Sequence, residues 1–337
     1  MRPIAFYISG HGYGHAVRTG EVIRALQRLQ PDRKIFVRTR APRRMLPAGI
    51  EYGESDFEPR VVERRAGVVI DPVQTLTGLK NFLERWDDVV TREVTFARAH
   101  RVALIVSDIP AIAGDVAHAA GVPCVGISNF TWDWIFEPYA SGYLDRFEQG
   151  YSRMDALLRL PFHQPERLNW FRRIVDVPLI ARKSSIDLSP YSSKPKRVLL
   201  GSRAQVSADV LDRAQRTSPD FEFVTVAEGM NFTDTLAGCD LVIAKLGYSM
   251  VAECIAARKP LLYPPRENFR EESILQQHVF QHIPALPIPL QDFYSGDWRS
   301  YLLQLLAMPA VQTDIRTDGA AVCAELIAVG TSEFTVC

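Results

Sequence analysis

The chain has 337 residues, which is too long for one ordinary hydrophobic core and suits two domains of about 150 residues each. Its 39 basic and 39 acidic residues cancel, which argues against a nucleic-acid surface driven by bulk positive charge. The apolar share is 47%, and no apolar run reaches the roughly 18 residues that a membrane span needs. We therefore expect a folded protein with no transmembrane segment and no nucleic-acid partner.

Cysteine usage and the first residues bear on the compartment. The five cysteines form no Cys-x-x-Cys pair, and Cys124, Cys239 and Cys254 stand among small apolar neighbours. This pattern predicts buried thiols in a reducing compartment. The chain also reaches an apolar strand pattern at Ile4, without a signal peptide before it. We expect a cytoplasmic protein, with peripheral contact to a membrane left open.

The first half of the chain alternates short apolar runs with helical patterns. Helical spacing of the apolar residues between Leu76 and Trp86 predicts one long helix within about 60–100, and small residues predict another helix at 111–120. This alternation is typical of a parallel sheet covered by helices. The expected strands are 4–8, 34–37, 102–106, 124–128 and 156–160.

After a segment rich in Pro, Ser and basic residues, the same scheme starts again. The expected strands of the second half are 197–200, 221–226, 241–244 and 260–263, and a last helix is expected at 320–329. The predicted fold class is therefore α/β, with two parallel-sheet domains. The predicted division is a first domain at 1–180, a linker at 181–196, a second domain at 197–319, and a C-terminal helical segment at 320–337 that can return to the first domain.

A glycine-rich turn joins the first strand to the first helix. Glycines at Gly10, Gly12 and Gly14 let the backbone bend sharply and approach a ligand, but they match neither the Rossmann fingerprint nor a P-loop. His11 and His15 are four apart, yet no Glu follows His11 as in H-E-x-x-H, so a metal site is not predicted. Two interpretations stay open: a histidine that hydrogen-bonds the turn, or His15 as a general base facing a cleft.

A second candidate base stands at the end of a strand of the same half. Asp108 ends the run 102–108, and ligands of α/β proteins bind at the carboxyl ends of such strands. The alternative is a carboxylate that caps the helix after Ile109-Pro110.

The strand at 241–244 leads into a short turn and a helix. Gly247 permits the turn, and the N–H groups of Tyr248 and Ser249 open the helix, where a diphosphate can sit. Lys245 would add a positive charge, and an exposed Glu253 could accept both hydroxyls of a ribose. The alternative is an ordinary Ser-capped helix whose Glu favours its first turn.

The loop after 260–263 and the segment near 230 are further candidates. A polar loop leads to a helix that begins near Glu271 and Glu272, which could hold sugar hydroxyls or merely form an exposed charged helix start. Near residue 230 we expect backbone groups around Met230 to contact the nucleotide base and Phe232 to stack on it.

Aromatic residues alternate after the strand at 124–128. Such rings can stack on sugars or apolar acceptors, or they can form one buried side of a strand or loop. The residues concerned are Phe130, Trp132, Trp134 and Phe136.

Together these motifs resemble those of glycosyltransferases of the GT-B class. Gly12-Tyr13-Gly14-His15 is similar to the acceptor-side loop of the family that includes the lipid II-forming N-acetylglucosaminyltransferase, and 247–253 followed by Glu271-Glu272 is similar to its donor site. Within the class, the chain resembles the glycosyltransferase-like N-terminal half of plant-type L-arabinokinase and its stand-alone bacterial relatives. The strings that carry this likeness are 10–18, 107–108, 128–135, 159–161, 176–179, 245–248 and 269–272.

The resemblance implies two Rossmann-like domains that face each other across a cleft, with the nucleotide-sugar bound mainly to the second. It puts Glu253 on the ribose and the helix start at 247–249 on the diphosphate. Glu271 and Glu272 stand where the family holds the donor sugar, although the familiar transferase has glutamines there.

The resemblance also assigns residues to the phosphate loop and to the acceptor. Gly201-Ser202 matches the phosphate loop of the second domain, with Arg203 in place of the usual second glycine. His15 matches a proposed base. The residues implied on the acceptor side are His11, Gly12, Gly14, Asn129, Trp132 and Asp133.

The sequence has no Asp-x-Asp, so a metal-bridged diphosphate is not favoured. We predict a metal-independent, inverting glycosyltransferase that uses a nucleoside-diphosphate sugar, UDP-linked by family resemblance, and no cofactor besides this co-substrate. The acceptor hydroxyl can belong to a small molecule, a lipid-linked molecule or a protein. Two alternatives stay open: a nucleotide-sugar epimerase on the same fold, and a binding module without catalysis.

Overall fold

The computed structural model describes residues 1–64, 69–164, 168–185, 195–201, 206–226, 230–266 and 269–329. The chain divides into two compact units. Unit 1 comprises Met1–Val62, Asp71–Ile180 and Arg316–Cys337, and unit 2 comprises Glu63–Ile70 and Ala181–Ile315.

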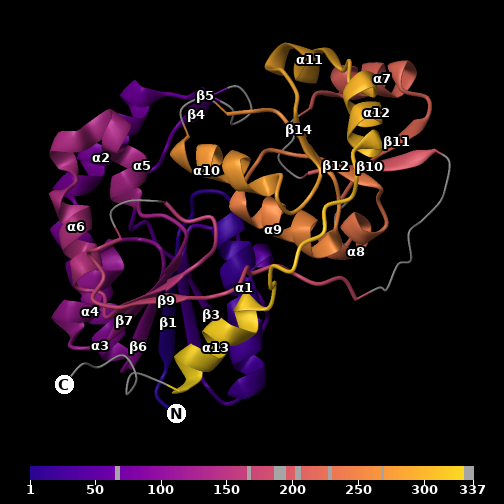
Figure 1. The fold of residues 1–337 in the computed structure, drawn as a ribbon. Coiled ribbons are helices and arrows are strands. Elements are labelled where there is room, and N and C mark those ends of the chain that lie inside the picture. The colour runs from indigo at the N-terminus through magenta and orange to yellow at the C-terminus, as the bar shows by residue number, and fades with distance from the viewer. Residues whose placement is uncertain are drawn as a thin grey trace. The chain divides into compact units, whose positions relative to one another are not determined.

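A parallel β-sheet forms the centre of unit 1 (Figure 1). In the described residues its strands follow the order β3-β2-β1-β6-β7-β8-β9. Strands β1, β6 and β7 are buried along their whole length, as uninterrupted apolar runs predict for a sheet with helices on both faces. The strands are β1 (Ile4–Ile8), β2 (Ile35–Thr39), β3 (Glu51–Glu54), β6 (Leu104–Asp108), β7 (Cys124–Ser128), β8 (Ala156–Arg159) and β9 (Ile174–Asp176).

Two helices replace the one long helix that was predicted within 60–100. The first begins after the N-cap Asp71 with Pro72, and the chain breaks at Arg85 before the second. The break lets the Trp86 side chain enter the core, where its indole N–H donates to Asp115 Oδ2 at 2.7 Å. The helices of unit 1 are α1 (Gly14–Leu29), α2 (Pro72–Glu84), α3 (Trp86–Ala99), α4 (Ile112–Ala120), α5 (Trp132–Ala140), α6 (Asp145–Ser152) and α13 (Gly319–Val329).

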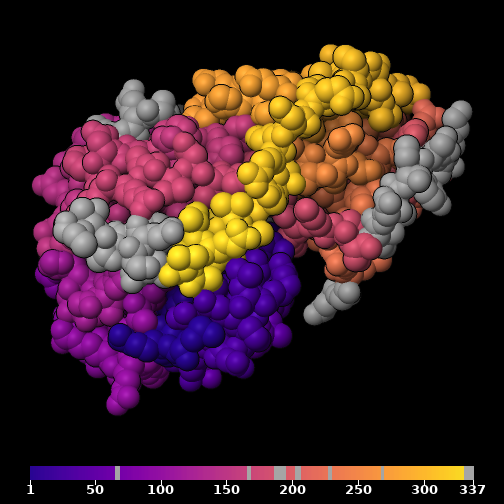
Figure 2. Space-filling model, turned by 60° about the horizontal axis from the view of Figure 1, so that its bottom comes forward, coloured from indigo at the N-terminus to yellow at the C-terminus, as the bar shows by residue number. Residues whose placement is uncertain are grey.

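The C-terminal helix α13 belongs to unit 1. It packs along α1, and Gln30 Nε2, just past the end of α1, donates to the Ala328 carbonyl at 3.1 Å. Figure 2 shows the yellow surface of α13 beside the indigo surface of the N-terminal residues. The last described helix thus supports the helix that carries His15.

Unit 2 has a second parallel sheet, whose described strands follow the order β11-β10-β12-β13-β14. Its core gathers around Trp298, which is packed among side chains of these strands and of α11 and α12. The strands are β10 (Lys196–Leu200), β11 (Phe221–Thr225), β12 (Leu241–Ile243), β13 (Leu261–Tyr263) and β14 (Ala285–Pro287). The helices are α7 (Ala208–Thr217), α8 (Phe232–Ala237), α9 (Tyr248–Ala257), α10 (Arg270–Val279), α11 (Leu290–Ser295) and α12 (Arg299–Ala307).

Two segments of unit 2 come from outside the predicted second domain. The short strands β4 (Glu63–Arg64) and β5 (Val69–Ile70) pair antiparallel and group with unit 2. In the predicted linker, residues 181–185 also group with unit 2, where Ser184 Oγ donates to Asp234 Oδ1 at 2.7 Å. Residues 186–194 of that linker lie outside the described residues.

Each sheet has a point at which the strand order reverses. In unit 1, β1 lies between β2 and β6, and in unit 2, β10 lies between β11 and β12. Ligands of open α/β sheets bind at the carboxyl ends of strands at such switch points. The turn after β1 and the turn after β12 are therefore the expected ligand-binding positions.

The sequence also predicted buried thiols and no transmembrane segment. The cysteines within the described ranges, Cys124, Cys239, Cys254 and Cys323, are buried and unpaired, which confirms the expected buried thiols. Among the described residues, no helix is both long enough and apolar enough to cross a bilayer.

Candidate active site

His15 and Asp108 meet at the switch point of the first sheet. His15 lies in the first turn of α1, directly after the glycine-rich turn, and Asp108 is the last residue of β6. Because β1 and β6 are adjacent parallel strands, with Ile8 opposite Asp108, their carboxyl ends bring the two side chains together. His15 Nδ1 lies 2.8 Å from Asp108 Oδ1. The structure thus joins the two predicted catalytic candidates in one hydrogen-bonded pair.

Asp108 is fully engaged by its neighbours. Arg18 donates from Nε to Oδ2 at 2.8 Å and from Nη2 to Oδ1 at 2.5 Å, and the Thr19 hydroxyl donates to Oδ2 at 2.5 Å. Burial alone would raise the pKa of Asp108, but the charges and hydrogen bonds of Arg18 and His15 outweigh it and hold the pKa well below its ordinary value. Asp108 is therefore a carboxylate at neutral pH and a poor proton acceptor.

Arg18 connects this pair to the next strand. It lies one helical turn after His15, is 2% exposed, and donates from Nη1 to Asn129 Oδ1 at 3.0 Å. Arg18 also stands in the string that carries the resemblance, but no role was predicted for it. The i, i+3 spacing from His15 on a helix that starts at the sheet edge is the signal that could have found it.

Glu58 is a second buried carboxylate near His15, and sequence reasoning missed it. Its Oε1 accepts from the Ser9 hydroxyl at 2.8 Å and from the Gly10 amide at 2.6 Å, so it holds the start of the glycine-rich turn. Burial raises the pKa of Glu58, and the nearby Arg40 and His15 offset only part of this rise. Glu58 comes from a segment without strand or helix periodicity, so no sequence pattern marked it.

The residues expected on the acceptor side surround His15. The His11 ring lies 5.4 Å from the Trp132 ring, and the His15 ring lies 6.3 Å from it. Gly12 has φ of 74°, a backbone conformation that glycine adopts without strain. Gly14 opens α1, and Asn129 is held by Arg18. The structure therefore brings the predicted acceptor-side residues of the turn and of the β7–α5 connection together.

The alternating aromatic residues are all buried, as one of the two interpretations predicted, but most of them lie in a helix and not in a strand or loop. From Trp132 onward they lie in the helix α5, whose start is fixed by the Tyr151 hydroxyl, which accepts from the Trp132 amide at 2.9 Å. The first five residues of α5 are all buried, so the alternation of aromatic residues does not mark a strand here. The four buried aromatic residues are Phe130, Trp132, Trp134 and Phe136.

Asp133 is the third acidic residue buried near this site. It lies in the first turn of α5 with an exposed fraction of 0%. Burial raises the pKa of Asp133 to about 6; it outweighs hydrogen bonds from Thr131 and from the Asp133 and Trp134 amides, which lower the pKa, and Glu148 adds to the rise. A buried carboxylate that costs stability is typical of a functional position.

Replacing Asp133 by Asn should stabilise the protein at neutral pH. The unfolded carboxyl ionises near pH 4 and the folded one near 6, so the folded state loses stability as pH rises through this window. Above it the carboxylate costs on the order of 3 kcal/mol, which the amide removes. Urea unfolding should show this gain at about pH 7.5 and none at about pH 4. In the exposed control Asp145→Asn we expect a change below about 1 kcal/mol; an equal gain at both pH values for Asp133→Asn would contradict the assignment.

In unit 2 the predicted diphosphate residues gather at the second switch point. Gly201 directly follows β10, and its amide donates to the carbonyl of Ile243 in the neighbouring strand β12 at 2.9 Å. Gly247 is the N-cap of α9, so the amides of Tyr248 and Ser249 lie in the first turn. Lys245 stands two residues before this N-cap. Ser202 and Arg203, the other two predicted diphosphate residues, lie outside the described residues.

The predicted ribose and base residues meet around an arginine that the sequence did not indicate. Glu253 is buried, not exposed as predicted, and its Oε1 accepts from Arg182 Nε. The Arg182 guanidinium lies 4.8 Å from the centre of the Phe232 ring. Met230 is 57% exposed at the start of this segment. Arg182 lies in the segment predicted as a linker. Because that segment is rich in Pro, Ser and basic residues, no role was predicted for a single arginine in it.

Glu271 and Glu272 are both buried in the first turn of α10. Glu272 accepts from the Arg266 amide and from Arg266 Nε, each at 2.6 Å. Burial raises the pKa of Glu272, although Arg266 offsets part of this. The exposed charged helix start that was kept as an alternative is therefore not what the structure shows.

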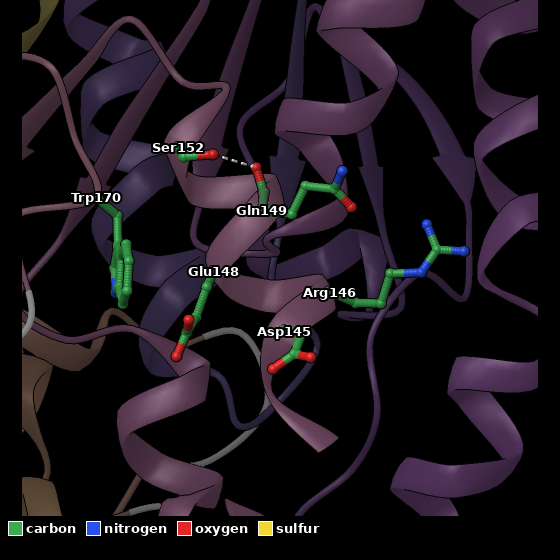
Figure 3. A pocket seen from close by; sticks show the side chains of 6 residues that line it. All are labelled: Asp145, Arg146, Glu148, Gln149, Ser152 and Trp170. Carbon is green, nitrogen blue, oxygen red and sulfur yellow. Dashed lines mark hydrogen bonds between the residues drawn. The ribbon is translucent and has the colours of Figure 1, made fainter. Parts of the chain in front are cut away.

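A hollow on the surface of unit 1 lies apart from these residues. It has a volume of about 430 Å³ and is lined by five residues of α6 and by Trp170 from a neighbouring turn (Figure 3). Its acidic members are Asp145 and Glu148. None of the predicted site residues in the described part of the chain lines it.

No protein-family model matches the chain. The L-arabinokinase of Arabidopsis thaliana is 26% identical over 349 residues, which covers 90% of the chain and 32% of that protein. The chain thus spans about a third of the length of this curated relative.

Solved structures match nearly the whole chain. The glycotransferase of kitacinnamycin gives a TM-score of 0.61 at 15% identity, covering 99% of this chain and 97% of that chain. The UGT2 of Phytolacca americana, complexed with UDP-2fluoro-glucose and pterostilbene, gives 0.60 at 12% identity, covering 96% and 93%. The chain has the GT-B fold.

The GT-B fold confirms the predicted fold class of two parallel-sheet α/β domains. The similarity to L-arabinokinase agrees with the likeness read from the motifs. The proposed function of this GT-B protein therefore rests on the residues at its two switch points.

Proposed function

We propose that this GT-B protein is a metal-independent, inverting glycosyltransferase that moves a sugar from a nucleoside-diphosphate sugar, UDP-linked in the simplest case, to an acceptor hydroxyl. The observation that carries the proposal is the contact of 2.8 Å between His15 Nδ1 and Asp108 Oδ1. The fold shared with Phytolacca UGT2, solved with a UDP-sugar analogue, supports the donor class.

In the proposed reaction His15 is the base and Asp108 positions it. His15 Nδ1 lies 2.8 Å from the ionised Asp108 Oδ1 and 3.1 Å from Arg18 Nη2. Because the carboxylate contact is the shorter one and Arg18 already donates to Asp108, we assign the proton to Nδ1, which leaves Nε2 with its lone pair. Both oxygens of Asp108 already accept hydrogen bonds from Arg18, so Asp108 orients the ring and balances the charge that forms on it. Of the two candidate bases, this arrangement favours His15.

The chemical step is a direct displacement. Nε2 of His15 takes the proton of the acceptor hydroxyl, and the oxygen attacks C1 of the sugar. The bond from C1 to the diphosphate oxygen breaks with its electron pair on the diphosphate, so the configuration at C1 inverts. The leaving diphosphate is stabilised by the start of α9, by Ser249 and by Lys245, each contributing on the order of 2–4 kcal/mol in the transition state.

Other residues take roles in binding. Glu253, held by Arg182, accepts hydrogen bonds from the ribose, and Phe232 with Met230 contacts the base. Glu271 and Glu272 take part in binding the donor sugar, either by contacting it or by positioning side chains that contact the donor. On the acceptor side we assign His11, Gly12, Gly14, Asn129, Trp132 and Asp133, which come from the glycine-rich turn and from the β7–α5 connection and the start of α5.

A donor panel tests the function. We expect one UDP-, GDP- or dTDP-sugar to release its nucleoside diphosphate slowly when water replaces the acceptor, and faster when an accepted hydroxyl compound is added. An epimer formed from the donor alone would favour an epimerase instead. Tight binding without release across the acceptor panel would favour a binding module. Mass spectrometry and NMR of the sugar products distinguish the three results.

A further inference from the structure

A carboxylate already occupies the anion-binding side of the second switch point. Glu63 of β4 extends its Oε2 to 3.3 Å from Lys245 Nζ and its Oε1 to 3.6 Å from Arg266 Nη1. Both cations are largely buried, with side-chain exposed fractions of 11% and 7%. A carboxylate between two buried cations marks a place that binds oxyanions.

Arg266 is fixed beside the start of α9. Its Nη2 donates to the carbonyl of Leu246 at 3.1 Å, and Leu246 directly precedes the N-cap Gly247. Its guanidinium also lies 4.1 Å from the centre of the Phe269 ring. The planar group is therefore held at the helix start where the diphosphate is proposed to bind, and it adds a donor that the sequence did not indicate.

Glu272 holds Arg266 in this place. Its two oxygens accept from the Arg266 amide and Nε, each at 2.6 Å, and its exposed fraction is 1%. These two bonds use the amide and Nε of Arg266, so that Nη1 faces Glu63 and Nη2 faces the Leu246 carbonyl. Glu272 is then a positioning residue for Arg266, which differs from the direct sugar contact implied by the resemblance.

The space before α9 can admit a ligand. A Cβ atom added at Gly247 would meet no atom of the described residues within 4 Å. By contrast, a Cβ at Gly201 would lie 2.7 Å from Ala244 Cβ. The open side of the switch point is therefore at the N-cap of α9, next to Lys245 and Arg266.

The charges around Lys245 and Arg266 determine which carboxylate an entering diphosphate displaces. Lys245 and Arg266 are balanced by Glu63 and Glu272 within this group of four, so an added dianion meets two carboxylates as well as two cations. Glu272 is buried with two bonds of 2.6 Å, whereas Glu63 is 17% exposed with contacts of 3.3 and 3.6 Å. The weaker and more exposed partner, Glu63, is the one that leaves.

We propose that Glu63 occupies the diphosphate's place between Lys245 and Arg266, and that the donor binds by displacing it. Arg266 then becomes a diphosphate ligand, with Glu272 as its positioning residue. This inference rests on the proposed function for the identity of the ligand. It implies that Glu63 weakens binding of the donor and of the released nucleoside diphosphate alike, so that this carboxylate also favours product release.

The test compares variants by calorimetric titration with UDP, GDP, dTDP and inorganic pyrophosphate, the last of which needs no matching base. Glu63→Gln should tighten binding of the accepted diphosphate about tenfold, because the amide no longer competes for the two cations. The matched control Glu222→Gln removes the same charge from β11 at its Arg197 pair and should leave the affinity unchanged. Arg266→Gln should weaken binding at least tenfold. In the double variant with Glu63→Gln, the affinity should rise much less than tenfold above that of Arg266→Gln alone.

The outcomes separate the two proposals. If the wild type and Glu63→Gln bind a nucleoside diphosphate with equal affinity, the displacement is wrong and the glycosyltransferase proposal stands. If pyrophosphate binds with the predicted dependence on Glu63 but no nucleotide or nucleotide-sugar binds, the anion site stands and the donor assignment falls. If neither pyrophosphate nor any nucleotide binds either form, both are overturned.

Discussion

Replacing His15 by alanine is expected to lower turnover by about a hundredfold to ten-thousandfold, because the acceptor hydroxyl loses its proton acceptor. The dissociation constant of the donor should stay unchanged, since His15 belongs to unit 1 and the proposed diphosphate residues belong to unit 2. Steady-state kinetics for turnover and titration calorimetry for donor binding measure the two effects separately.

The control for this variant is His118→Ala, which removes an exposed histidine of α4 in the same unit. It should leave both turnover and donor affinity as in the wild type. Thermal unfolding of both variants shows whether they are folded. Turnover of the His15 variant equal to that of the wild type would remove His15 from the mechanism.

The second large effect concerns the buried pair of Arg18 and Asp108. Replacing Asp108 by Asn leaves the Arg18 charge buried without its counter-ion, which should lower the free energy of unfolding by about 3–5 kcal/mol. The double variant Arg18→Met with Asp108→Asn removes both charges and should recover most of that loss. Its turnover should stay low, because His15 still lacks the carboxylate that fixes its ring. Urea unfolding and steady-state kinetics measure the two quantities.

An exposed pair of the same kind serves as the control. Arg159 and Asp176 also form a two-bond contact, at 2.6 and 2.8 Å, but the Asp176 side chain is 70% exposed. Asp176→Asn should therefore cost less than about 1 kcal/mol and leave turnover unchanged. A loss at Asp108 as small as the loss at Asp176 would show that the Arg18 charge is not buried as the structure has it.

Much of the fold follows from local sequence patterns. Buried parallel strands such as β1 and β7 read as continuous apolar runs, because both faces of the sheet are covered. The break between α2 and α3 was missed because helical spacing continues through Arg85, whereas the contact of Trp86 with Asp115 that accompanies the break is a tertiary one. The start of α3 did carry a local sign, since Asp87 and Asp88 stand in its first turn.

The site could be predicted only where it lies on the turns after strands. His15 follows the turn after β1, and Asp108 ends β6, the strand next to β1, so sheet topology brings these two side chains together. Gly247 and Ser249 follow β12, at the switch point of the second sheet. The partners that fix their neighbourhood are long side chains from elsewhere in the chain. Glu58, Arg182, Glu63 and Arg266 come from segments without periodic patterns, and their partners are set by tertiary packing.

The most direct test of the account is the configuration at C1 of the transferred sugar. With an α-linked UDP-sugar and water or an accepted alcohol, NMR of the product before mutarotation should show the β-anomer, because a hydroxyl activated at His15 displaces the diphosphate in one step. A product that keeps the α-configuration would contradict direct displacement and the role assigned to the pair formed by His15 and Asp108.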